Sequence, residues 1–142
     1  MALRAATVAL ICMGVSCGAI VGQVPFSQEG TGETTFQAKA GNVSFWTDFR
    51  ALYHGDMRAY ILVELVQDGV VVSSAICDPV HLGASHACTH RLWSWETHDQ
   101  RCAMACDAYV PRAGPTQVRA SLAIPGRPAD LRLTRANLIV RQ

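Results

Sequence analysis

The chain of 142 residues carries 12 lysines and arginines against 11 aspartates and glutamates, and half of its residues are hydrophobic. Without an N-terminal signal it would keep roughly 120 residues, which is one domain with a core of its own. Because the charges balance, we expect neither the basic surface with which proteins bind nucleic acid nor electrostatic attachment to a membrane.

The N-terminus has the pattern of an export signal. Arg4 precedes the uncharged, mostly apolar segment 5–15, which is shorter than the about 20 apolar residues that cross a bilayer. Small residues then follow, among them Gly14, Ser16 and Gly18. This arrangement is typical of a cleavable signal peptide, which we place at residues 1–22.

Two kinds of cleavage remain open. Residues 15–18, Val-Ser-Cys-Gly, resemble the lipobox of bacterial lipoproteins, in which a small residue precedes the cysteine that becomes lipidated. The resemblance implies that Cys17 carries the lipid and that segment 23–34, rich in Gly, Thr and Glu, is a flexible tether. The alternative is ordinary cleavage after Ala19 or Gly22, which would release a secreted protein. Both interpretations place the protein outside the cytoplasm.

From residue 35 onward the apolar residues alternate with polar ones, which is the period of a half-buried β-strand. The cleanest strand is 117–124. Asp68-Gly69 stands between the apolar runs 60–66 and 70–76, and Asp-Gly predicts a hairpin because glycine tolerates the positive φ of a tight turn. The sequence therefore predicts one all-β domain over 35–142. We expect an antiparallel β-sandwich, jelly-roll or immunoglobulin-like, of about seven or eight strands.

Four cysteines stand in a polar excursion between the predicted strands: Cys77, Cys88, Cys102 and Cys106. In an exported protein an even number of cysteines indicates disulfides, here with three ways to pair. In an extended strand Cys102 and Cys106 would be about 13 Å apart, and a disulfide needs less than about 7 Å. Two pairings remain, and we favour the nested one, Cys77 with Cys106 and Cys88 with Cys102, which follows if residues 106–110 begin a strand beside the one that ends at Cys77.

Two other groups in this excursion are candidate binding sites. His86 and His90 would share one face of a strand with Cys88 between them, and such a pair suits zinc or copper. Trp93 and Trp95 would also share a face. They could stack on sugar rings, or they could pack against the core as large aromatics commonly do.

The sequence contains no Gly-x-Ser-x-Gly nucleophile elbow, no His-Glu-x-x-His zinc motif and no phosphate-binding glycine loop. We therefore expect no enzyme and no cofactor. The favoured hypothesis is an exported lipoprotein or secreted β-sandwich with a structural or binding role. The alternatives are a carbohydrate- or ligand-binding module and an extracytoplasmic metal-binding protein. The expected partners are a membrane, through the lipid anchor, and a protein or glycan, but no nucleic acid.

Overall fold

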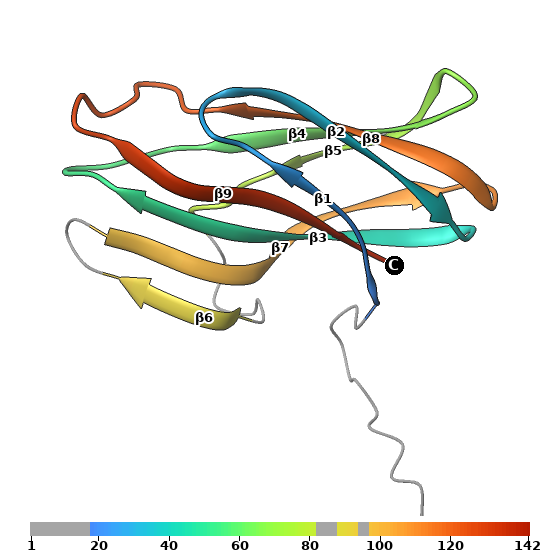
Figure 1. Cartoon of the computed structure of the whole chain (residues 1–142), viewed down its shortest axis with the longest axis horizontal. Helices are drawn as coiled ribbons and strands as arrows, with labels where there is room; N and C mark the ends of the chain where they lie inside the picture. Colours follow the sequence, from blue (N-terminus) through green and yellow to red (C-terminus); the bar gives the residue numbers. More distant parts are fainter. Residues whose placement is uncertain (1–17, 82–87, 94–96) are drawn as a thin grey trace, which may run out of the picture.

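The computed structural model describes residues 18–81, 88–93 and 97–142, and for 88–93 and Thr97 only the backbone. The described residues form two antiparallel sheets packed face to face, so the predicted β-sandwich is confirmed (Figure 1). Within these residues, no helix is long and apolar enough to span a membrane.

The first sheet, which we call sheet A, has the order β1-β9-β3-β7-β6. Its strands are β1 (Ile20–Pro25), β9 (Arg132–Arg141), β3 (Gly41–Leu52), β7 (Thr97–Val110) and β6 (Cys88–Trp93). The second sheet, sheet B, has the order β2-β8-β4-β5. Its strands are β2 (Gly30–Ala38), β8 (Gly114–Ala123), β4 (Tyr60–Gln67) and β5 (Val70–Cys77).

The chain is arranged like one long antiparallel hairpin that has been rolled up. Strand β4 pairs with β5, β3 with β7, β2 with β8 and β1 with β9, so the first half of the chain pairs with the second half along its length. Without β6, the two four-stranded sheets have the strand order of a jelly roll. Strand β6 extends sheet A at one edge and brings the number of described strands to nine.

The core lies between the sheets and follows from the alternation of each strand. In β8, Val118, Ala120 and Leu122 are buried, and Gln117 and Arg119 point outward. Burial of a large apolar side chain stabilises a fold by about 1.5–3 kcal/mol. The largest fully buried apolar side chains come from both sheets: Phe45, Phe49, Ile61, Leu65 and Leu138, with Met57 from a loop.

The predicted hairpin is present. Asp68 has a φ of 50° and Gly69 a φ of 77°, so both turn residues adopt the left-handed conformation that a two-residue turn between twisted strands requires. The flanking strands β4 and β5 match the predicted runs to within one residue at each end.

Segment 23–34 is not the flexible tether that its composition indicated. Most of it belongs to β1 and β2, and β1 pairs with β9 in the register Gln23↔Ile139. Val24 is fully buried, and the Phe26 N–H donates a hydrogen bond of 2.7 Å to the Ala136 carbonyl. The domain therefore includes residues well before position 35. The prediction was wrong because β1, despite its polar surroundings in sequence, is stabilised by pairing with a strand more than 100 residues away.

Candidate functional site

One predicted disulfide is confirmed. Cys77, at the end of β5, bonds to Cys106 of β7, with the two Cα atoms 5.4 Å apart and 29 positions apart in sequence. Because β5 belongs to sheet B and β7 to sheet A, the bond joins the two sheets covalently.

The second predicted pair is placed only by the backbone. The register of β6 and β7 puts Cys88 opposite Cys102, and the buried Cys102 is disulfide-bonded. The side chain of Cys88 lies outside the described residues, so the pairing of Cys88 with Cys102 stays a prediction.

The other predicted sites also fall outside the described side chains. Trp93 and His90 belong to β6, of which only the backbone is described, and Trp95, His86 and Cys17 lie in segments that are not described. The sugar-stacking platform, the histidine metal site and the lipidation site remain predictions. Among the residues described, no group of three or more metal-ligating side chains could hold a metal ion.

Charged residues gather on the outer surface of sheet A, a feature that sequence reasoning missed. They alternate with inward residues such as Phe49 and Leu138, and three neighbouring strands supply them. We call this surface the basic face. Its described charged residues are Arg50, Arg101, Arg132, Arg135 and Arg141, with Asp48, Asp99 and Asp107.

Asp48, on the central strand β3, lies beneath two arginines of the neighbouring strands. Its side chain is only 6% exposed, and its carboxylate accepts hydrogen bonds from Arg101 Nη2 at 2.9 Å and Arg135 Nε at 2.7 Å. Burial alone would raise the pKa of Asp48, but the bonds from the two guanidinium groups outweigh it and the pKa lies below its ordinary value. Asp48 is therefore ionised at neutral pH.

Arg135 continues the network to a second buried carboxylate. Its Nη2 donates to Asp99 Oδ1 at 2.7 Å, and the Nε of Arg50 lies 3.8 Å from the other oxygen of Asp99. Burial would lower the pKa of Arg135, yet the carboxylates of Asp48 and Asp99 raise it. Arg50 and Arg135 are directly opposite each other on β3 and β9, and the Asp99 carboxylate that both approach offsets the repulsion between them.

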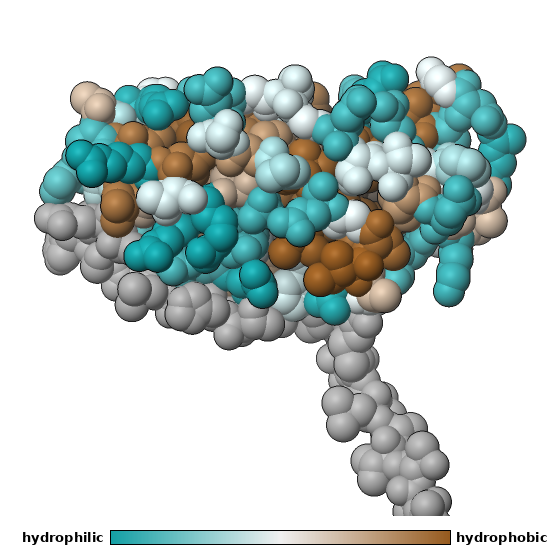
Figure 2. All heavy atoms as spheres, viewed as in Figure 1, coloured by the Kyte–Doolittle hydropathy of each residue, from teal (hydrophilic) through white to brown (hydrophobic). Residues whose placement is uncertain are grey.

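The buried aspartates hold the arginines in place and leave them accessible. The side chains of Arg101, Arg50 and Arg135 are 53%, 45% and 38% exposed. In Figure 2 hydrophilic residues cover β9 and β3 in the left half of the view. A fixed guanidinium group with N–H donors turned to solvent is suited to bind carboxylate or phosphate oxygens.

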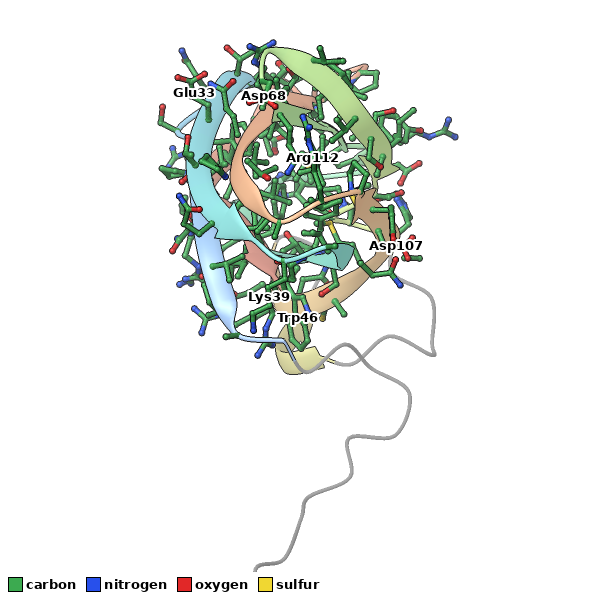
Figure 3. The ribbon with its side chains drawn as sticks, turned by 90° about the vertical axis from the view of Figure 1, so that its right-hand side faces the viewer. Glu33, Lys39, Trp46, Asp68, Asp107 and Arg112 are labelled. Atoms are coloured by element: carbon green, nitrogen blue, oxygen red, sulfur yellow. A yellow bond between two sulfur atoms is a disulfide. The ribbon has the colours of Figure 1, made fainter. Side chains whose placement is uncertain are left out.

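One end of the basic face meets the point where the described chain begins. Arg141 Nε donates a hydrogen bond of 2.7 Å to the Gly18 carbonyl, and its guanidinium group lies 4.7 Å from the centre of the Trp46 ring. Ile20 is opposite Arg141 in the β1–β9 pairing and is 63% exposed. Hydrophobic residues gather where the start of β1 crosses the end of β9 (Figure 2), and Trp46 and Lys39 lie at this same end of the molecule (Figure 3).

A second feature is a pocket of about 460 Å³ at the loops after β3 and before β9. His54 contacts the Asp130 carboxylate through Nδ1, and its backbone N–H lies 3.4 Å from Asp130 Oδ1. The hydrogen bond from the His54 side chain lowers the pKa of Asp130 below its ordinary value. The other described lining residues are Leu52, Tyr53, Ala129, Leu131 and Arg132. The carboxylate therefore orients the imidazole, and these described residues include no serine or cysteine nucleophile.

No signal in the sequence could have identified this pocket or the basic face, because their residues meet only through the strand register. His54 and Asp130 are 76 positions apart, and Asp48 and Arg135 are 87 positions apart. No protein-family model matches the chain, and no curated protein matches it.

Proposed function

We propose that the chain is an exported β-sandwich with a structural or binding role, held at a membrane through lipidated Cys17 or released after cleavage near Ala19. The Cys77–Cys106 disulfide carries this proposal. Disulfides of this kind form and persist in oxidising compartments and are rare in the cytosol. The bond also links strands of different sheets, which suits a small domain outside the cell.

The start of the fold supports a cut close to Cys17 or Ala19. Strand β1 begins at Ile20, and the carbonyl of Ala19 accepts a hydrogen bond of 3.1 Å from the Gln142 N–H. Cleavage before Cys17 would leave both β1 and this hydrogen bond in place, whereas cleavage after Ala19 would leave β1 whole but remove the Ala19 carbonyl. Cleavage after Gly22 would remove half of β1 and its pairing with the last strand, so we discard that position.

The geometry supports binding rather than catalysis. The buried carboxylates of the basic face are each occupied by arginine, which makes them supports for the guanidinium groups instead of acid or base groups facing a substrate. The Trp93–Trp95 platform and the His86–His90 metal site remain alternatives, and titrations of the protein with oligosaccharides and with zinc would test them.

The decisive experiment is an intact-mass measurement of the unreduced mature protein from its native host. We expect a chain that starts at Cys17 with acyl groups, or at Ile20 without them, and that lacks four hydrogens because of two disulfides. A full-length chain with free thiols would overturn the proposal. Cys17→Ala should move a lipidated protein out of the membrane fraction, whereas Cys12→Ala, inside the expected signal, is the matched control and should not.

A further inference from the structure

We propose that the basic face of sheet A is a docking surface for an anionic lipid bilayer, so that the sandwich lies with this face against the membrane. The choice of a bilayer rests on the proposed anchoring at Cys17. The inference goes beyond the anchor, because it assigns a second contact between the folded domain and the lipid headgroups.

The balanced charge of the whole chain conceals an uneven distribution. On the described part of the basic face, five arginines stand against three aspartates. Two of the aspartates lie beneath the arginines: Asp48 and Asp99 are only 4% and 6% exposed when the whole residue is counted. Asp107 is the exposed aspartate of this face. The outer surface of sheet B has the opposite balance, with Arg119 between Glu33 and Glu64 in the strand register. The expectation that the protein has no electrostatic attraction to membranes came from total charge, which averages over both surfaces.

The arginines are arranged so that they can meet a surface of phosphates. They come from the neighbouring strands β7, β3 and β9, and their shared aspartates fix the positions of Arg101, Arg50 and Arg135. Arg132 is exposed and makes no ion pair with a described residue. A planar guanidinium group can bind two phosphate oxygens at once, and each basic residue near an anionic membrane strengthens binding about five-fold.

The direction from which the chain enters the domain favours a bilayer over a soluble anionic partner. Arg141 belongs to the basic face, and it binds the carbonyl of Gly18, the residue next to Cys17. A lipid on Cys17 would therefore hold this end of the face at the membrane. Ile20 lies opposite Arg141 in the register, on the same side of the sheet, and its exposed side chain could enter the interface. Stable anchoring takes two membrane-binding signals, and one lipid chain combined with a basic patch is one such combination.

Vesicle binding by an unlipidated chain that starts at Gly18 tests the surface independently of the anchor. The chain from Gly18 onward contains all nine described strands and their hydrogen bonds, and it can be exported behind the cleavable leader of a soluble protein. We expect it to sediment with vesicles of equal parts phosphatidylglycerol and phosphatidylcholine. We expect no binding to pure phosphatidylcholine vesicles, and loss of binding to the anionic vesicles at high salt.

Two charge reversals on opposite surfaces test whether binding depends on the basic face or only on the net charge of the protein. Arg132→Glu, which breaks no ion pair with a described residue, should weaken binding about 25-fold, because it changes two charge units at about five-fold each. Arg119→Glu, on the outer surface of sheet B, makes the same change in net charge and should leave binding unchanged. Ile20→Ser should weaken binding less than the loss of charge does.

The proposal is overturned if pure phosphatidylcholine binds equally well or if Arg119→Glu weakens binding as much as Arg132→Glu. It is also overturned if the protein binds a single-stranded oligonucleotide or an acidic polysaccharide but not the anionic vesicles. These outcomes leave the intact-mass result untouched. Conversely, a mature protein without acyl groups would contradict lipidation at Cys17, whereas the vesicle data would still test whether the basic face binds membranes.

Discussion

Replacement of Asp48 by asparagine should measure how much the network of the basic face stabilises the fold. The carboxylate accepts one hydrogen bond from each of two arginines, and such charge-assisted bonds contribute about 1.5–3 kcal/mol each. Both arginines are partly exposed, so water would hydrate the guanidinium groups that lose the carboxylate. The side-chain oxygen of asparagine would still accept one weaker hydrogen bond. We therefore expect Asp48→Asn to lower the free energy of unfolding by about 1–2 kcal/mol, or Tm by about 3–8 °C.

The assay is thermal and urea unfolding, followed by tryptophan fluorescence with the disulfides intact, at neutral and acid pH. Because the pKa of Asp48 is lower in the folded protein than in the unfolded chain, its stabilisation is complete above about pH 4 and is lost as the pH falls through the folded pKa. The difference between wild type and Asp48→Asn should therefore shrink in acid. A difference that persists at low pH, or an equal effect of Asp107→Asn on the exposed control carboxylate, would refute this reasoning.

Three further predictions concern other parts of the fold. Replacement of both Cys77 and Cys106 by alanine should lower the free energy of unfolding by about 3–4 kcal/mol, as expected for release of a loop of this length; an unchanged urea midpoint would contradict it. In His54→Ala the pKa of Asp130 should rise toward its ordinary value in a carbon-13 NMR titration, and an unmoved titration would show that the histidine does not perturb the carboxylate. Gly69→Ala should cost about 1 kcal/mol because the φ of 77° is unfavourable for alanine, whereas thermal unfolding with an unchanged Tm would argue against a strained turn.

Alternation identified the strands whose inward residues are apolar, and it failed where they are polar. The β4–β5 hairpin was predicted almost at its observed bounds, and β8 was identified although it begins at Gly114, before the predicted strand 117–124. Strand β7 was interpreted as part of a polar excursion because His98 and Gln100 point inward and are each only 1% exposed. Their burial is supported by contacts that spacing cannot reveal: His98 lies edge-on to the Phe49 ring, and Gln100 donates to the Pro79 carbonyl.

Polar composition also led to a wrong prediction for the N-terminal strands, which were interpreted as a flexible tether. Thr31 and Glu33 indicated a tether, but they are outward residues of β2, and Phe36 and Ala38 of the same strand point into the core. The nested pairing of Cys77 with Cys106 could be predicted because extended-strand geometry excludes the local pair and because residues 106–110 were expected in a strand beside the one that ends at Cys77. The basic face could not, since nothing in a single sequence indicates which arginines a strand register will bring together.

The rolled-hairpin topology has a consequence for how the molecule is assembled. The turn at Asp68-Gly69 closes the most local pairing, whereas β1 finds its partner only in β9, at the far end of the polypeptide. The average sequence separation between contacting strands is therefore large, which slows folding because long loops must close first. Strand β1 therefore has to wait for β9. Sheet A cannot be completed until β9 has left the ribosome.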